Sequence, residues 1–522
     1  RPQAAATWFD LGCARMRVAG STTAAGDADA LDAAARAFSA PGEPGAEARK
    51  DLRATAEALC DALLEIDAGA AGEAAQDAVA RCGEAWWARE NAPFVAPRCL
   101  PYLLVRALSS GGGASDIRRV GAADAMLSVV DLDDDTAAPL RGLLAQTATS
   151  AKFLRAAPGR DFVARLLARG GDVAADAHAA VKKALPAWPA ARCRSAGDCY
   201  RRAWLVADAA GSRDTVEDEL LQDLARSLLF CRDAKLHDKL SSLLSAALHD
   251  KRDDPKLAGC VERVYAPLLW RHLKYPLPEA RRRAYAVLGA CFPVSDAAAP
   301  TKKKKTKTQA AARGAAIEAQ LELLRAGVAD DPSPVVRAAA CSAAGAALSR
   351  RWAELPLGPA TSVVKLLGGR GARDATAATV REAALRALGT LCGKGSKVPK
   401  TGAGANALKA SVRDASRAVH DVAPRCRAAA ATLIAQFGEK FGLDAAFSAA
   451  GGSRLLARLA ADDAANPRAA DAVAALLARA HFPADDGVAQ VRRAVALHAK
   501  HPRAARALYG RLDGLAKPAD VA

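Results

Sequence analysis

Apolar residues recur at helical spacing along most of the chain, and strand-like alternation is almost absent. Residues 214–230 show this most clearly, because Val216, Leu220, Leu221, Leu224 and Leu228 lie on one helical face. The same pattern, less regular, predicts further helices at 46–66, 97–108, 122–132, 138–147, 159–168, 176–185, 236–248 and 257–273. The pattern therefore predicts an all-α protein.

A short phrase recurs in the second half of the chain. It has Asp, then Pro three residues on, Arg six residues on, and three Ala, and it occurs at 331–340 and 421–430. Weaker copies surround Arg281 and Arg381, so that the four arginines at 281, 337, 381 and 427 are 56, 44 and 46 residues apart. A period of about 40–47 residues with two helices per unit is typical of HEAT and armadillo repeats. We therefore expect an α-solenoid, a fold that binds partners along an extended surface.

The residue types in this phrase suit the start of a helix. Asp331 and Asp421 are expected to cap the helix N-terminus with a side-chain oxygen and a favourable charge. Pro334 and Pro424 then fall where a missing N–H costs nothing. In HEAT repeats the arginine typically reaches the Asp of a neighbouring repeat. The predicted repeat-stacking residues are Asp331, Arg337, Arg381, Asp421 and Arg427.

Composition agrees with stacked helices and suggests no metal or cofactor. The chain is 51% hydrophobic but only 5% aromatic, and its dominant residue, Ala, is the best helix former. None of its 12 cysteines forms a Cys-x-x-Cys pair or has a His at zinc-ligand spacing. Cysteines 291, 341, 392 and 426 fall on apolar helix faces, as buried core residues do. No stretch approaches the roughly 20 apolar residues of a membrane span.

The positive charge is concentrated in one segment. The net charge is +17, and residues 271–440 hold 29 basic and 12 acidic residues, whereas the remainder is balanced at 45 of each. Clustered basicity predicts a polyanionic partner, here double-stranded DNA or chromatin, held by salt-sensitive phosphate contacts. The candidate contacts are Arg281, Arg282, Arg283, Lys302, Lys303, Lys304, Lys305, Lys394, Lys397 and Lys400.

The lysine tract at 302–307 is open to three interpretations. Like charges in a run repel one another and favour a loop. The loop could be a nuclear localisation signal made by Lys302, Lys303, Lys304, Lys305 and Lys307, a DNA contact, or a solvated loop without a role. A second basic loop at 394–400 could project from the same edge of the solenoid. Neither loop contains aromatic residues, so stacking on single-stranded bases is not expected.

The chain contains none of the common catalytic motifs. The chain has no phosphate-binding Gly-x-x-x-x-Gly-Lys-Ser/Thr loop and no Gly-x-Ser-x-Gly elbow. Its eight histidines are scattered, and paired carboxylates such as Asp462 and Asp463 are interpreted as turn and cap residues. We expect neither enzymatic activity nor a small-molecule substrate.

An ordered set of phrases resembles the G2 family of condensin II subunits. It includes Val-Tyr-Ala-Pro-Leu-Leu-Trp-Arg at 264–271, Cys-Phe-Pro-Val-Ser-Asp at 291–296, the Asp-Pro-Ser-Pro-Val-Val-Arg turn at 331–337 with Trp352 downstream, and Ala-Ala-Arg-Ala-Leu-Tyr at 504–509. The matching order runs from about residue 99 to residue 511. The lysine tract and Cys426, in place of Val, depart from the family pattern. The chain starts at Arg1 and lacks the family's C-terminal half, so we expect a fragment.

This resemblance implies a regulatory HEAT subunit in mitotic chromosome condensation, located in the nucleus and on chromosomes. Its implied partners are the kleisin and SMC subunits of condensin II, together with DNA. The expected segments are a degenerate helical region at 1–98, degenerate repeats at 99–256, HEAT repeats with basic loops at 257–440, and further helical repeats at 441–522. The alternatives are the condensin I G subunit, a nuclear transport receptor or a tubulin-folding cofactor; transport receptors are usually acidic.

Overall fold

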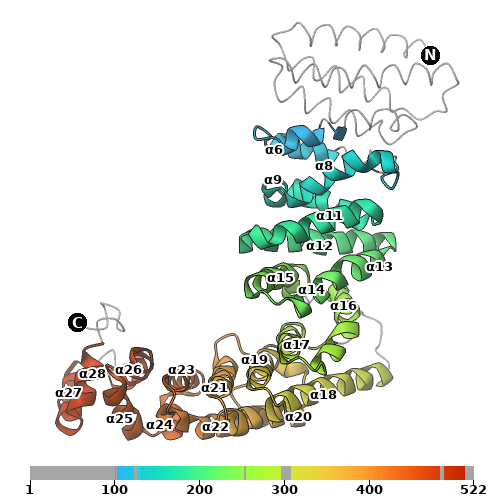
Figure 1. The fold of residues 1–522 in the computed structure, drawn as a ribbon. Helices are drawn as coiled ribbons and strands as arrows, with labels where there is room; N and C mark the ends of the chain where they lie inside the picture. The colour runs from blue at the N-terminus through green and yellow to red at the C-terminus, as the bar shows by residue number, and fades with distance from the viewer. Residues whose placement is uncertain are drawn as a thin grey trace, which may run out of the picture. The chain divides into compact units, whose positions relative to one another are not determined.

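Helices make up all the regular structure that the computed structural model describes, which covers residues 100–101, 103–122, 127, 130–251, 254–294, 307–481 and 487–511 (Figure 1). The predicted all-α solenoid class is therefore confirmed. The expected helix at 46–66 lies outside the described residues. The chain divides into two compact units, Arg1–Lys251 and Arg252–Ala522. This division is coarser than the four segments expected from the sequence, which stay a prediction.

The first unit is a stack of antiparallel helices. Its core contains Phe153, Phe162, Tyr200 and Trp204, each at most 1% exposed. Helices α10, α12 and α15 contact one another in succession, and α8 packs on α11. The helices are α6 (Ala114–Ala122), α8 (Ala138–Thr149), α9 (Ala151–Arg155), α10 (Ala157–Ala168), α11 (Gly171–Ala184), α12 (Ala190–Ala210), α13 (Arg213–Thr215), α14 (Gln222–Phe230) and α15 (Ala234–Ala247).

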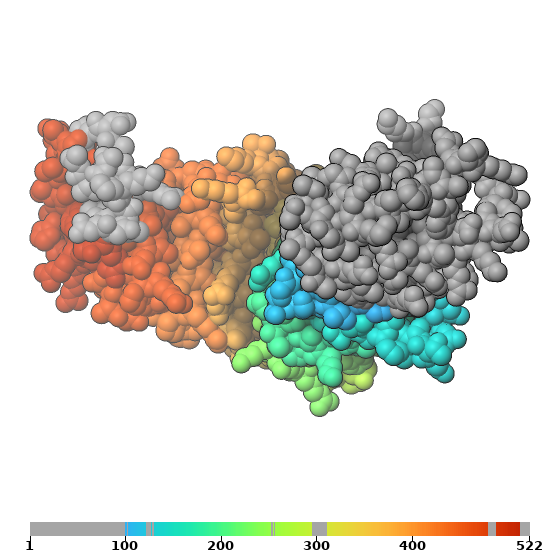
Figure 2. All heavy atoms as spheres, turned by 90° about the horizontal axis from the view of Figure 1, so that it is seen from above, coloured from blue at the N-terminus to red at the C-terminus, as the bar shows by residue number. Residues whose placement is uncertain are grey.

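The second unit consists of two rows of helices. In one row α17, α19, α21, α23 and α26 each contact the next, and in the other row α18, α20, α22 and α24 do so (Figure 1). Figure 2 shows their surface in chain order, from yellow to red. The bounds are α16 (Pro255–Leu273), α17 (Pro278–Cys291), α18 (Lys307–Ala329), α19 (Pro334–Arg351), α20 (Leu357–Leu366), α21 (Ala378–Cys392), α22 (Gly402–Ala415), α23 (Pro424–Phe441), α24 (Leu443–Ala450), α25 (Gly452–Asp462), α26 (Pro467–His481), α27 (Gly487–Lys500) and α28 (Pro502–Tyr509).

Several predicted boundaries in the first unit need correction. Helix α11 begins at Gly171 rather than at 176, and residues 130–132, expected to end the helix at 122–132, are bent and irregular. The predicted helix at 214–230 includes a π-helical turn, Val216–Leu221. Helix α12 was not predicted, because much of its buried face is made of small residues such as Ala196, Gly197 and Ala203 rather than a leucine stripe. Small buried residues leave little periodic signal in the sequence.

Glycines set the spacing between helices of the first row in the second unit. A Cβ on Gly289 would lie 2.7 Å from the Cα of Ala343, and a Cβ on Gly345 would lie 2.8 Å from the Cα of Ala387. The backbones of α17 and α19, and of α19 and α21, are therefore in direct contact. Gly389 of α21 differs, because only the Gln436 side chain of α23 comes within 4 Å of its Cβ position. Helices α21 and α23 are thus farther apart at this level.

Candidate interaction surfaces

Four arginines near the starts of α17, α19, α21 and α23 form a ladder from one repeat to the next. In each pair the arginine Nε lies within 3.0 Å of a carboxylate oxygen. The pairs are Arg281 with Asp331 (2.8 Å), Arg337 with Asp374 (2.9 Å), Arg381 with Asp421 (2.6 Å) and Arg427 with Asp462 (3.0 Å). Each Nη1 donates to backbone carbonyls just before its own helix, as in Arg337 to Asp331 at 2.9 Å. Each arginine thus joins its own turn to the turn of the following repeat.

The predicted capping role of Asp331 and Asp421 needs correction. The N-cap positions of α19 and α23 are Ser333 and Ala423, and neither side chain makes a cap hydrogen bond. The Oδ1 atoms of Asp331 and Asp421 instead accept the backbone N–H of these two residues, at 2.9 and 2.8 Å. Because each Asp lies two residues before the N-cap, its carboxylate fixes the turn and faces the preceding arginine.

Two ladder carboxylates were missed in the sequence. Asp374 precedes Arg381 by seven residues rather than six, which hid it in the weak repeat; its Oδ1 accepts the N–H groups of Thr376 and Ala377. Asp462, interpreted from the sequence as a turn or cap residue, is instead 1% exposed and also accepts from Arg458 at 2.7 Å. A count from each Arg back to the nearest Asp, allowing one extra residue, would have found Asp374.

The first unit contains a related arrangement. Arg160 contacts Asp198 at 3.2 Å and donates to the carbonyl of Arg155 at 2.7 Å. Arg141 contacts Asp176 at 3.2 Å and donates to the carbonyl of Leu132 at 2.7 Å. In both cases a Pro at the helix start precedes the arginine by two residues, a signal that the sequence carries but the longer phrase concealed.

Hydrogen bonds keep two ladder carboxylates ionised. Burial alone would raise the pKa of Asp374 and of Asp421. Hydrogen bonds from Arg337 and Thr376 to Asp374, and from Arg381 and the Ala423 N–H to Asp421, outweigh burial and hold both pKa values below the ordinary range. Both carboxylates are therefore charged at neutral pH.

The structure narrows the set of candidate phosphate contacts. Arg281 is engaged with Asp331 and its side chain is 11% exposed, while Arg283 is 6% exposed, so neither presents its charge to solvent. Arg282 is 35% exposed and pairs with Glu279. Lys302, Lys303, Lys304 and Lys305 lie outside the described residues, and Lys307 is the first residue of α18. The exposed candidates are Lys394, Lys397 and Lys400.

These three lysines lie on the basic loop, residues 393–401, which connects α21 to α22. The loop is anchored, because the N–H of Lys397 donates to the carbonyl of Ser349 at 2.7 Å and Val398 is 4% exposed. Beneath it, Lys440 donates to the carbonyl of Leu391 at 2.9 Å. Burial, assisted by the charge of Lys400, lowers the pKa of Lys440. The loop therefore holds three positive charges at a fixed, exposed position.

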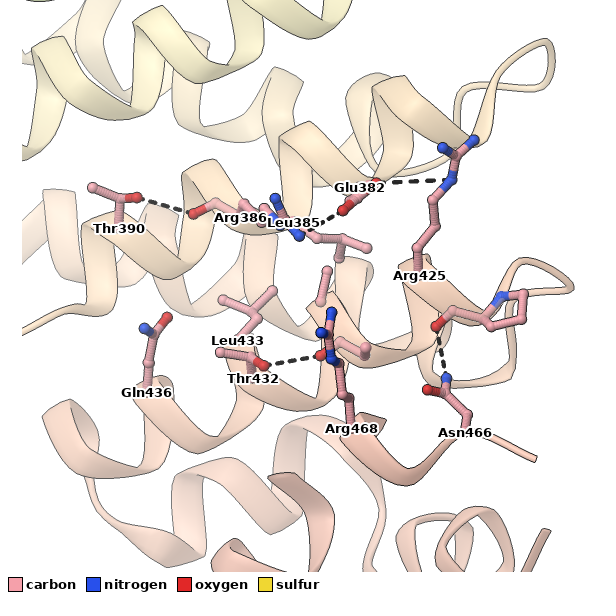
Figure 3. Close-up of a pocket in the computed structure, with 13 residues that line it drawn as sticks. Glu382, Leu385, Arg386, Thr390, Arg425, Thr432, Leu433, Gln436, Asn466 and Arg468 are labelled. Carbon is pink, nitrogen blue, oxygen red and sulfur yellow. Dashed lines mark hydrogen bonds and ion pairs between the residues drawn. The ribbon is translucent and has the colours of Figure 1, made fainter. Parts of the chain in front are cut away.

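A groove of about 610 Å³ lies between α21, α23 and α26 (Figure 3). Its polar side chains were not predicted from the sequence, because they come from three different repeats. Of its apolar lining, Pro424 and Ala428 are accessible, whereas Leu385 and Leu433 are 0% and 1% exposed. The lining residues are Glu382, Leu385, Arg386, Thr390, Pro424, Arg425, Ala428, Ala429, Thr432, Leu433, Gln436, Asn466 and Arg468.

Arginine dominates the polar wall of this groove. Glu382 is 17% exposed and pairs with Arg386 at 2.7 Å, while the Nε of Arg425 lies 3.7 Å from its other oxygen (Figure 3). The side chains of Arg386 and Arg425 are 73% and 51% exposed, and Arg468 is also exposed. With three guanidinium groups and one carboxylate, the groove carries an excess of positive charge.

Features typical of other functions were not found in the described part of the chain. Within it, no group of three or more His, Cys, Asp or Glu side chains could hold a metal ion. Among the same residues, no helix is long and apolar enough to cross a membrane.

The second unit has two contacting rows of helices, and an arginine links each repeat to the next. This arrangement is that of HEAT-type α-solenoids. Among solved structures, Kap121p bound to Pho4p aligns with 97% of this chain and 54% of its own, at 13% identity and a TM-score of 0.40. Residues 146–296 match the family described as the condensin II non structural maintenance of chromosomes subunit.

Similar curated proteins carry a single name. The Danio rerio condensin-2 complex subunit G2 is 25% identical over 347 residues, which cover 66% of this chain and 29% of that protein. The Homo sapiens protein of the same name is 24% identical over 287 residues, 55% of this chain and 24% of its own length. The predicted resemblance is therefore confirmed, and the matched part spans less than a third of these relatives.

Proposed function

We propose that the chain is a non-catalytic HEAT scaffold within a condensin II-type complex and acts in chromosome condensation in the nucleus. The match of residues 146–296 to the condensin II non-SMC family carries this proposal. The kleisin and SMC subunits are its proposed protein partners, with the kleisin running along the solenoid. A solenoid suits this role because each repeat adds surface without requiring a catalytic centre.

DNA contact is the second part of the proposed function. The excess of basic residues between 271 and 440 supports it, as does the basic loop, where Lys394, Lys397 and Lys400 are exposed. Lysines on a fixed loop can neutralise phosphates of a duplex without reading its sequence. The proposed contact is therefore independent of DNA sequence and weakens as the salt concentration rises.

Affinity purification of the full-length protein from mitotic cells, followed by mass spectrometry, tests the proposed complex. We expect two SMC ATPases, a kleisin and a second HEAT subunit to remain bound in moderate salt. The identity of the SMC pair and the kleisin would then distinguish condensin II from condensin I. Recovery of tubulin or of transport cargo instead would overturn the proposed function and leave the solenoid fold intact.

A further inference from the structure

The groove between α21, α23 and α26 lies at a joint where, beside Gly389, the helix backbones are not in direct contact, unlike the two joints before it. At the joints before α21, a glycine on one helix lies against the backbone of an alanine on the next, as Gly345 does against Ala387. At the following joint Gly389 faces only the side chain of Gln436. The extra space is lined by residues of three helices and opens to solvent. The groove is thus a built feature of the packing.

The charges in the groove are not balanced by the protein. Glu382 is the single carboxylate of the lining and is shared by Arg386 and Arg425. Arg468, on α26, has no ion-pair partner among the described residues. Two positive charges therefore remain for a ligand. Exposed guanidinium groups bind carboxylates with bidentate geometry, so the groove suits an acidic ligand.

The groove also contains groups that suit a peptide backbone. The Gln436 amide, which points toward α21, forms no hydrogen bond with the described residues (Figure 3). A side-chain amide can both donate to a peptide carbonyl and accept from a peptide N–H. The accessible apolar floor between these polar groups consists of Pro424 and Ala428, because Leu385, Ala429 and Leu433 are only 0%, 6% and 1% exposed. An extended peptide offers alternating side chains, some for this floor and others for the arginines.

We propose that this groove binds an extended, acidic peptide segment of a partner protein. Neighbouring packed helices are about 8–10 Å apart, so a path across α21, α23 and α26 is about 20 Å long and takes about six extended residues. Acidic side chains of the segment pair with Arg425 and Arg468, and its apolar side chains cover Pro424 and Ala428. A DNA duplex offers only sugars and phosphates at its backbone and has no apolar side chain to place on Pro424 and Ala428, so the peptide is the better match.

This inference goes beyond the proposed function, since it assigns a site and a ligand chemistry that do not depend on which complex the chain joins. Peptide binding is measured on the purified chain, whereas the proposed complex is tested by co-purification from cells. Failure of one experiment therefore leaves the other unaffected.

The test is fluorescence anisotropy with the full 522-residue chain. The probe is a fluorescein-labelled peptide of about twelve alternating Glu and Leu residues, a length that spans the groove with both ends free. The comparison peptide has Gln in place of Glu. We expect the Glu-Leu peptide to bind and the Gln-Leu peptide to bind about tenfold more weakly, which corresponds to about 1.4 kcal/mol. The Arg425→Glu/Arg468→Glu double variant should lose binding of the Glu-Leu peptide by at least about tenfold.

The matched control is Arg413→Glu/Arg417→Glu, which makes the same change of charge at exposed positions outside the groove lining. This control should bind the Glu-Leu peptide as the wild type does. Equal loss in both double variants would reduce the effect to overall charge and overturn the inference. The single variant Arg468→Gln, which breaks no ion pair of the described residues, gives a second measurement if the double variant unfolds; unchanged affinity there would also contradict the proposal.

A duplex of random sequence, added as a competitor, separates the peptide from DNA. We expect DNA to bind the chain without displacing the peptide, and the groove variant to keep its affinity for DNA. Displacement of the peptide together with loss of DNA affinity in Arg425→Glu/Arg468→Glu would identify the groove as a phosphate site and overturn the inference.

Discussion

The ladder arginines act at two places at once. Arg337 donates to Asp374 of the next repeat and to the carbonyls of Asp331 and Pro332 in its own turn. Its side chain and that of Asp374 are each 11% exposed, so solvent screens the pair only weakly. Removal of one partner from such a pair leaves the other charge buried and poorly solvated. The resulting loss in the free energy of unfolding is larger than the net contribution of the intact pair.

We therefore expect Arg337→Ala to lower the free energy of unfolding by about 2–3 kcal/mol, because Asp374 loses its partner and two carbonyls lose a donor. Thermal and urea unfolding followed by circular dichroism measure the change. The control is Arg350→Ala, which removes an exposed arginine from the same helix and should have little effect. An unchanged melting curve for Arg337→Ala would show that the ladder does not stabilise this repeat.

The same carboxylates make stability depend on pH. The pKa of Asp374 and of Asp421 is lowered in the folded chain, whereas an Asp in an unfolded chain titrates near about 3.9. Their contribution is therefore present above the unfolded pKa and is lost as the pH falls through the folded pKa. In urea unfolding from about pH 6 to about pH 3, Asp374→Asn should reduce the acid-dependent loss of stability. The exposed Asp414→Asn should not, and an equal reduction in both variants would contradict this assignment.

At the scale of helices, glycines decide how closely the repeats stack. Gly345 allows α19 to lie directly on the backbone of α21, whereas Gly389 meets only a flexible amide. An added methyl group at the first position has no space to enter, because a backbone cannot rotate away as a side chain can. Inside a helix, Ala is otherwise favoured over Gly by roughly 0.5–1 kcal/mol.

We expect Gly345→Ala to destabilise the chain by about 1–3 kcal/mol through overpacking. Gly389→Ala should be neutral or slightly stabilising, because Gln436 can change rotamer and the helix gains propensity. Urea unfolding of the two variants side by side provides the comparison. Equal destabilisation by both would mean that α21 and α23 are as tightly packed as α19 and α21.

The sequence predicts those elements whose start and stop signals are local. The helices that begin at Pro334 and Pro424 are expected from their own residues, and the spacing of the arginines indicates the repeat. Asp374 was missed because one extra residue shifts its register, and α12 because its buried face consists largely of small residues. The groove could not be predicted, since Arg386, Arg425 and Arg468 come together only through the stacking of three helices.

At the scale of the whole chain, the basic charge and the most regular repeats occupy the same unit. The excess of 17 positive charges falls between residues 271 and 440, and the ladder arginines in this range are neutralised by their Asp partners. The charge available to a polyanion therefore resides on loops and on exposed helix faces. In the proposed DNA contact, long-range attraction would then depend on those loops and on ionic strength.

Replacing Lys394, Lys397 and Lys400 with Gln should weaken DNA binding and flatten its salt dependence by about 0.9 per lost phosphate contact. Replacing Lys302, Lys303, Lys304 and Lys305 with Gln tests the other loop in the same way. Affinity for a duplex is measured at several salt concentrations, with Arg454→Gln on α25 as an exposed control outside the basic segment. If replacement of residues 302–305 leaves the salt dependence of DNA affinity unchanged, the remaining interpretations of this tract are a nuclear localisation signal or a loop without a role.

The unequal contacts between neighbouring helices imply that the second unit is stiffer at some joints than at others. Where the backbones of α19 and α21 are in direct contact, a displacement of one helix requires the other helix to move with it. Where α21 meets α23, the flexible Gln436 side chain lies between the helices, and a change of its rotamer can absorb part of the displacement. A peptide bound in the groove would restrict the movement of Gln436 and make this joint between α21 and α23 stiffer. Occupancy of the groove would then govern how far a load applied at one end travels along the repeats.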